Sequence, residues 1–160
     1  MAKKVKNKKT LVEQILTKAG IEHTGIQVNA LEGELPSEYD RTHIFKTLAL
    51  LGDKTGPIIG IVPITEHLAE KKLAKVSGNK KVSMIPQKDL EKTTGYIHGA
   101  NNPVGIRQKH NYPIFIDQTA LGLDQMIVSA GEVGHSIIIR PRDLASFVKA
   151  DFADILEESK

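Results

Sequence analysis

The sequence contains no cysteine and few aromatic residues. The absence of cysteine excludes a disulfide framework, a thiol nucleophile and any zinc site with a cysteine ligand. It also fits a reducing compartment, so we expect the protein in the cytoplasm. The seven aromatic residues, four Phe and three Tyr, are too few for a surface that stacks a series of unpaired bases. Any nucleic-acid contact is therefore expected to use the phosphate backbone and one pocket.

Long apolar runs and familiar catalytic motifs are also absent. No segment reaches the ~18 continuous apolar residues that a membrane span needs, and the first residues lack the apolar centre of a signal peptide. The sequence contains no G-x-S-x-G, no H-E-x-x-H and no P-loop motif. The six histidines are scattered without the spacing of metal ligands, at positions 23, 43, 67, 98, 110 and 135. We therefore expect neither a membrane segment nor a metal or other cofactor.

The positive charge of the chain is concentrated in two segments. The 160 residues carry a net charge of +3, yet residues 1–9 hold five Lys and no acid, and residues 71–92 hold seven Lys against two acids. Such segments can meet a phosphate backbone, although a solvated helix face and a disordered tail have the same composition. We expect a disordered basic tail at 1–9 and a single domain over 10–160. The candidate phosphate contacts are Lys71, Lys72 and Lys75.

The spacing of apolar residues predicts short helices and strands. Thr10 and Glu13 form a capping box that opens a helix with Leu11 on its apolar stripe. Strands are predicted at residues 21–28, 43–51, 57–64, 80–85, 113–117, 125–129 and 135–139. Further helices are predicted after a Thr65 cap, with Val76 on the buried side, at 86–94, and from Pro141 through Leu156. Because the strands occur in neighbouring groups with helices at the edges, we predict an α+β fold with a mixed, largely antiparallel sheet.

One lysine lies in a segment that otherwise has the pattern of a buried strand. In HIFKTLALL, residues 43–51, the side chains alternate between two apolar faces, so Lys46 has no evident route to water. Burial of an unpaired ammonium is costly. Either Lys46 lies near a strand end and reaches solvent along its stem, or it lies at the floor of a pocket. In a pocket it would meet a phosphate, a carboxylate or a carbonyl.

A second informative segment is rich in glycine. Residues 95–107 read GYIHGANNPVGIR, and this segment also contains His98. Gly95, Gly99 and Gly105 would let main-chain N–H groups approach a ligand and hold a carbonyl oxygen or an oxyanion. An ordinary long connection is the alternative. Residues 129–134 have the same ambiguity, because a plain hairpin turn would also explain them.

Three motifs together resemble a known family. FKTLAL at 45–50, TGYIHGANNPVG at 94–105 and VSAGEVG at 128–134 resemble, in this order, the YbaK/EbsC family. Its members are free-standing aminoacyl-tRNA deacylases related to the editing domain of bacterial prolyl-tRNA synthetases. The resemblance runs from about Thr10 to Ile155. It implies a sheet curled towards a barrel and flanked by helices, a pocket for the 3′ end of a charged tRNA, and prolyl-tRNA synthetase as a candidate partner.

The resemblance also implies roles for individual residues. The essential lysine of the family falls on Lys46, and cysteinyl-tRNA(Pro) is the implied substrate. The implied substrate-binding residues are Gly99, Ala100, Asn101, Asn102, Pro103, Gly105, Ser129 and Gly131. The resemblance implies that water, or the thiol of a bound cysteinyl group, attacks the ester. Lys46 would neutralise charge near the ester while N–H groups around Gly99 hold its carbonyl. The concentration of positive charge, rather than the resemblance, predicts that Lys71, Lys72 and Lys75 face the tRNA.

Departures from the family pattern leave alternatives open. The loop reads GANNP where the pattern is closer to GGISP, so Asn101 and Asn102 replace an apolar residue and a serine. Val28 stands where many relatives have tyrosine, and the segment before Lys46 is too short for a helix that many members contain. The substrate could therefore be alanyl- or another small aminoacyl-tRNA. A catalytically silent tRNA-binding or regulatory protein is the alternative to an enzyme.

Overall fold

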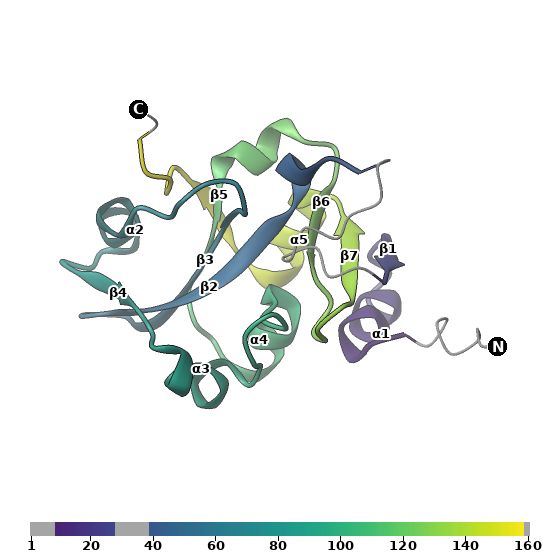
Figure 1. Ribbon diagram of the computed structural model, residues 1–160, viewed down its shortest axis with the longest axis horizontal. Helices are drawn as coiled ribbons and strands as arrows, with labels where there is room; N and C mark the ends of the chain where they lie inside the picture. The colour runs from purple at the N-terminus through teal and green to yellow at the C-terminus, as the bar shows by residue number, and fades with distance from the viewer. Residues whose placement is uncertain (1–8, 28–38, 159–160) are drawn as a thin grey trace.

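The computed structural model describes residues 9–27 and 39–158, which form short helices and strands (Figure 1). The strands are β1 (His23–Ile26), β2 (Phe45–Gly52), β3 (Gly56–Pro63), β4 (Val82–Met84), β5 (Ile114–Asp117), β6 (Met126–Ser129), β7 (Ser136–Ile139) and β8 (Asp151–Ala153). The helices are α1 (Leu11–Lys18), α2 (Glu70–Ser77), α3 (Gln87–Thr94), α4 (Pro103–Lys109) and α5 (Pro141–Val148), with single 3-10 turns at Arg41–His43 and Gln118–Gly122.

The strands form two sheets. One has five strands in the order β4-β2-β3-β5-β8, and the other has three in the order β1-β7-β6. The pairings are antiparallel except those of β5 with β3 and with β8. The predicted α+β fold with a mixed, largely antiparallel sheet is therefore confirmed. In the part of the chain that the structure describes, a single bridge from Ile44 to Ile127 links the two sheets, and neither closes into a barrel.

Helices cover both faces of the five-stranded sheet. Ile59 and Ile61 of β3 point into the main core, which α1, α4 and α5 complete together with β6 and β7. Ile58 and Val62, on the other face of β3, pack in a second cluster that includes α2. Burial of both faces explains the nearly continuous apolar run of β3.

The edge of β2 opens where β4 ends. β2 pairs with β3 along its whole length, but β4 pairs only with Leu50–Gly52. At the other end of the strand, Ile44 makes a single parallel bridge to Ile127 of β6. The stretch from Lys46 to Leu48 therefore has no strand beside it, on the side away from β3, among the described residues. This gap lies between the two sheets and positions the pocket described below.

The predicted start of the first helix is confirmed. The Thr10 side chain accepts a hydrogen bond from the Glu13 N–H (3.2 Å), and the Glu13 carboxylate accepts one from the Thr10 N–H (2.9 Å). Val12 and Leu16 are buried beneath this capping box. Leu11, predicted on the buried stripe, is instead 60% exposed.

Two predicted helices are wrong in their bounds. The C-terminal helix was expected to continue to Leu156, but it ends at Val148, where Lys149 adopts a left-handed conformation with φ 58°. The following residues form β8, which pairs with β5. The second helix begins after Ala69 rather than at a Thr65 cap, and Val76 lies on its exposed side.

The glycine-rich segment is shorter than predicted. Pro103–Lys109 is helix α4, so only the part before it is a connection. Asn102 caps this helix with its side chain, and Pro103 occupies the first helical position, where its missing N–H costs nothing.

Several sequence predictions fall on residues outside those described. They are the tail at 1–8, the tyrosine position at Val28, and the segment before Lys46 that lacks a helix of the family. Within the described residues, no helix is long and apolar enough to cross a membrane.

Candidate functional site

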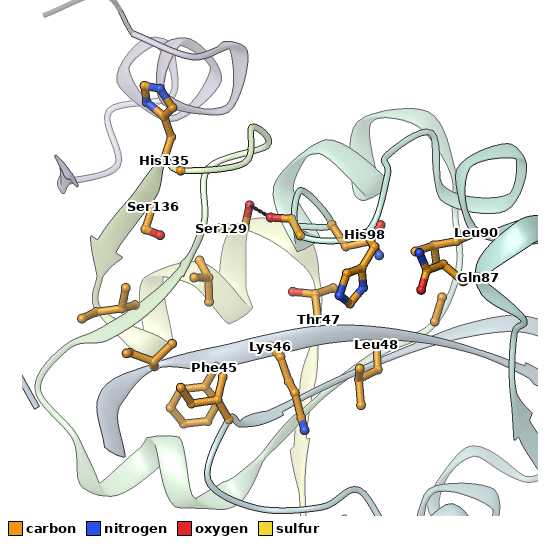
Figure 2. A pocket seen from close by; sticks show the side chains of 18 of the residues that line it. Phe45, Lys46, Thr47, Leu48, Gln87, Leu90, His98, Ser129, His135 and Ser136 are labelled. Carbon is orange, nitrogen blue, oxygen red and sulfur yellow. Dashed lines mark hydrogen bonds between the residues drawn. The ribbon is translucent and has the colours of Figure 1, made fainter. Parts of the chain in front are cut away.

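A pocket of about 460 Å³ lies at the gap in the edge of β2 (Figure 2). This volume lies in the range of small-molecule sites. The pocket is lined by Ile44, Phe45, Lys46, Thr47, Leu48, Ala49, Ile64, Met84, Ile85, Gln87, Leu90, His98, Gly99, Asn101, Ile127, Val128, Ser129, Gly134, His135 and Ser136. These residues come from β2 and the residue before it, the residue that follows β3, the β4–α3 segment, the loop before α4, and the β6–β7 hairpin. All three motifs of the sequence analysis thus contribute to one pocket.

Lys46 lines this pocket but is not buried. Its side chain is partly exposed, so of the two positions that the sequence left open, Lys46 reaches solvent and also lines a pocket. Among the described residues it makes no hydrogen bond or ion pair. Figure 2 shows its ammonium on the opposite side of β2 from Thr47 and Ser129. The pocket therefore reaches around the open edge of the strand, with a cation on one side.

Thr47 lies on the other side of the same strand. Its side chain is 9% exposed, and its hydroxyl is the buried side-chain atom without a hydrogen-bond partner in the described part of the chain. Buried hydroxyls are normally bonded, and leaving one unpaired costs folding free energy. The Thr47 side chain and the His98 ring lie on the same side of β2 (Figure 2).

Ser129 and Gly99 join the hairpin to the loop. The Ser129 Oγ accepts the N–H of Gly131 (3.1 Å) and donates towards the Gly99 carbonyl at 3.5 Å, a long contact. Gly99 has φ 91°, in the left-handed region that favours glycine, and a Cβ there would lie 3.4 Å from the Val133 side chain. Gly131 also has a positive φ and lies behind the pocket against Val12.

The two asparagines of the loop differ in position. Asn101 lines the pocket, and its Oδ1 lies 2.8 Å from the Thr94 hydroxyl. Asn102 is fully buried: its Oδ1 accepts the N–H of Gly105, and its Nδ2 donates to the Ala100 carbonyl (3.0 Å). Asn102 thus holds the loop to α4 without reaching the pocket surface.

Other predicted substrate-binding residues also lie behind the pocket surface. Ala100, Pro103 and Gly105 are buried, and none of these described residues lines the pocket. Gly105 is required for packing, because a Cβ at this position would overlap the Tyr96 ring. The structure brings Lys46, Gly99, Asn101 and Ser129 to the pocket and places the remaining predicted residues in the layer that supports it.

The three lysines predicted to face tRNA lie on α2. Lys71 and Lys75 are exposed, whereas Lys72 makes ion pairs with Asp154 and Glu158, each at 3.0 Å. The hydrogen bonds that the Lys72 ammonium donates, first to Glu158 and then to Asp154, raise the pKa of Lys72 above its ordinary value. The positive charge of Lys72 is therefore already paired with two carboxylates in the free protein. None of these three described side chains lines the pocket itself.

Sequence reasoning missed Thr47 and Gln87 as pocket residues. Thr47 follows Lys46 directly, but its exposure to the pocket depends on where β4 ends, which is not a local signal. No group of three or more His, Cys, Asp or Glu that could hold a metal ion occurs among the residues described.

Comparisons with known proteins agree with the arrangement of the pocket. The sequence profile of the aminoacyl-tRNA editing domain family matches residues 31–147. EbsC of Enterococcus faecalis, named as a candidate Cys-tRNA(Pro)/Cys-tRNA(Cys) deacylase, is 36% identical over 162 residues, which cover 97% of this chain and 98% of its own. This relative is similar along its whole length.

Solved structures share the fold. A candidate trans-editing enzyme for prolyl-tRNA synthetase aligns with a TM-score of 0.78 and 21% identity, over 92% of this chain and 95% of its own. The hypothetical protein APE2540 aligns with a TM-score of 0.81 and 20% identity, over 91% of this chain and 99% of its own. At these identities the solved structures show a common fold alone. Because the family profile covers most of the sequence and EbsC matches nearly all of it, this chain belongs to the aminoacyl-tRNA editing domain family.

Proposed function

We propose that this protein is a free-standing editing enzyme that removes a wrongly attached amino acid from tRNA, with cysteinyl-tRNA(Pro) as its main substrate. One observation carries the proposal: Lys46, Gly99 and Ser129, from three separate segments, line a single pocket of about 460 Å³. A pocket of this size accepts an amino acid and its ribose. Family membership supports the reaction, and the name of EbsC supports the choice of cysteine.

The reaction requires little machinery because an aminoacyl ester is already activated. The protein has to hold the aminoacyl ester in the orientation that suits attack by the nucleophile, and to stabilise the negative charge that develops on the carbonyl oxygen. Lys46 is a flexible cation at the open edge of β2, within reach of a ribose and ester that lie across this edge. Gly99, which has no side chain of its own, also lines the pocket.

The thiol of the substrate is the nucleophile for the cysteinyl ester. The thiol loses its proton as its sulfur forms a bond to the carbonyl carbon, the bond from this carbon to the ribose oxygen breaks, and the ribose oxygen takes up a proton, so that the amino acid leaves as a cyclic thioester and the tRNA is released with a free hydroxyl. The protein chain has no cysteine of its own to do this. The role of the pocket is then to hold the amino acid in the conformation that brings its thiol to its carbonyl.

The substrate defines the other partners. We place the protein in the cytoplasm beside the translation machinery, where charged tRNA occurs. Prolyl-tRNA synthetase is the proposed source of tRNA selectivity, because the small pocket reads the amino acid and leaves most of the tRNA outside.

The test is deacylation of cysteinyl-, alanyl-, seryl- and prolyl-tRNA(Pro) by the wild type and by Lys46→Ala. We expect the fastest release from cysteinyl-tRNA and a large loss in the variant. Asn101, an amide at a pocket position where the family pattern is apolar, favours a second candidate, a small or polar amino acid other than cysteine. Preference for alanyl- or seryl-tRNA would establish this candidate. A wild type that is inactive on the whole panel would favour a silent tRNA-binding protein.

A further inference from the structure

The main chain of Thr47 points into the gap at the edge of β2. In an antiparallel pair, hydrogen-bonded and non-bonded residues alternate along each strand. The Ile64 N–H donates to the Ile44 carbonyl (2.9 Å), so the bonded residues of β2 are the even-numbered ones. The odd-numbered residues face the other way.

An independent hydrogen bond confirms this direction. Ala49, two residues beyond Thr47, accepts a hydrogen bond from the Ile85 N–H (3.1 Å) on the β4 side of the strand. The main chain of Thr47 points in the same direction, but β4 pairs only with Leu50–Gly52 and does not extend to Thr47. β3 lies on the opposite side of β2, so no described strand pairs with the outer side of Thr47. Its N–H and C=O are therefore available at the pocket edge, as on any open strand edge.

The side chain of Thr47 adds a third polar group at the same place. Its hydroxyl is more than nine-tenths buried, lines the pocket and has no partner among the described residues. A valine would fill the same volume without the cost of an unpaired hydroxyl. Threonine at this position is thus explained by a ligand that completes its hydrogen bonds when the pocket is occupied.

The chemistry of this end of the pocket favours a hydrogen-bond donor as the ligand. The Thr47 hydroxyl can accept as well as donate, the Thr47 carbonyl is an acceptor beside the open Thr47 N–H, and the Gly99 carbonyl is a further acceptor that receives only the long 3.5 Å contact from Ser129. Within the described chain, no carboxylate lines the pocket. The cation, Lys46, projects to the opposite side of the strand (Figure 2). A group that donates, and that is kept apart from Lys46, fits best here.

We infer that Thr47 positions the α-amino group of the aminoacyl ester, through its side-chain hydroxyl and its main-chain carbonyl. This inference rests on the proposed function and adds a recognition element to it. An amino group anchored at Thr47 leaves the ester carbonyl, two bonds away, at the edge of β2. Thr47 would therefore discriminate α-amino acyl groups from other acyl esters.

The experiment compares Thr47→Val and Thr47→Ser with the wild type on two substrates. One is cysteinyl-tRNA(Pro), and the other is tRNA(Pro) charged with mercaptopropionic acid, which is cysteine without its amino group. On cysteinyl-tRNA we expect Thr47→Val to lower kcat/KM by about 10- to 100-fold, as for one hydrogen bond to a polar or charged group, and Thr47→Ser to retain most of the rate. On the deamino substrate, wild type and Thr47→Val should react equally.

The change in Tm separates a role of Thr47 in ligand binding from a role in the fold, because only a hydroxyl that supports the fold would lower Tm when it is removed. Thr47→Val should raise Tm by about 2–5 °C, because it removes an unpaired buried hydroxyl. Thr94→Val is the matched comparison: the Thr94 hydroxyl is buried and contacts Leu90, Tyr96 and Asn101, so its removal should lower Tm.

The possible failures can be told apart. If the wild type deacylates cysteinyl-tRNA and Thr47→Val is equally active, the inference is wrong and the proposed function stands. If Thr47→Val loses the same factor on both substrates, Thr47 contacts a part of the substrate other than the amino group, and the inference is again wrong. A wild type inactive on every charged tRNA would overturn the proposed function together with the inference.

Discussion

The Ser129 hydroxyl lies 3.5 Å from the carbonyl oxygen of Gly99, thirty residues earlier in the chain. This contact joins the end of β6 to the loop before α4, and both residues line the same pocket. Ser129 is held in turn by the N–H of Gly131. The conformation of the glycine loop is thus tied to the hairpin that follows it much later in the sequence.

Replacement of Gly99 by valine should abolish deacylation. The φ of 91° disfavours any side chain, and the new Cβ would lie 3.4 Å from the Val133 side chain, so the added methyl groups would enter the space between loop and hairpin. We expect a loss of stability of about 1–2 kcal/mol from the left-handed conformation. The measurements are denaturant unfolding and single-turnover deacylation.

Gly20→Val is the matched control for the Gly99 variant. Gly20 also has a positive φ of 77°, a Cβ added there would meet no atom within 4 Å, and the residue lies at the end of α1 away from the pocket. This variant should lose similar stability and retain its activity. Equal activity of the Gly99 and Gly20 variants would make the loop a plain connection.

Lys46→Met should lose most of the deacylation rate with little change in stability. If the cation stabilises charge in the transition state, its removal costs about 10²–10³ in rate. Because Lys46 is partly exposed and unpaired among the described residues, the stabilisation expected for removal of a buried charge should be absent. Lys46→Arg should also be impaired, since a planar guanidinium does not replace a compact ammonium. An active Lys46→Met would contradict the catalytic assignment, and Lys18→Met is the control, because Lys18 is exposed on α1 and does not line the pocket.

Local patterns predicted the parts of the fold that depend on neighbours in sequence. The alternation around Lys46 predicted β2, and the Thr10–Glu13 pair predicted the start of α1. The remaining features depend on distant pairings. β8 forms because β5 offers it an edge, and the pocket opens beside β2 because β4 pairs no further than Leu50. Neither pairing leaves a mark in the local sequence, so the C-terminal helix was predicted too long, and the sequence left open whether Lys46 reaches solvent or lies at a pocket floor.

Asn102→Ala should act on stability, and Asn101→Ala on substrate preference. Asn102 is fully buried and caps α4, so its loss should cost about 1–2 kcal/mol, with the Gly105 N–H left unpaired. Asn101 lines the pocket, so its alanine variant should change the relative rates on cysteinyl- and alanyl-tRNA. Unfolding curves and the deacylation panel measure the two effects. An unchanged unfolding curve for Asn102→Ala would contradict its role as a cap.

Asp53 should make the stability of the β2–β3 turn depend on pH. Its carboxylate accepts the N–H groups of Lys81 (2.9 Å) and Lys80 (2.8 Å), and these bonds lower the pKa of Asp53 below 3.8. Since the pKa is lower in the folded state, this contribution is present above the unfolded pKa and is lost as the pH falls through the folded value. Asp53→Asn should therefore be less stable than wild type near neutral pH, and the difference should shrink in acid. Asp151→Asn, whose carboxylate has no described hydrogen bond, is the control; a difference independent of pH would contradict the assignment.

The exposed lysines of α2 should contribute to tRNA binding, and Lys72 should contribute less. α2 and Leu48, a neighbour of Lys46 on the same face of β2, belong to one cluster, so these cations and Lys46 lie on one side of the five-stranded sheet. Lys71→Gln with Lys75→Gln should weaken tRNA binding and flatten its dependence on log salt by about 0.7–0.9 per lost phosphate contact. Lys72→Gln should change this slope less, because binding a phosphate requires Lys72 to leave Asp154 and Glu158. Binding titrations at several salt concentrations measure the slopes.

Lys88→Gln on α3 tests the alternative surface, because Gln87 and Leu90 of the same helix line the pocket. If the double variant keeps the wild-type slope while Lys88→Gln lowers it, the tRNA lies along α3 and the assignment to α2 is wrong.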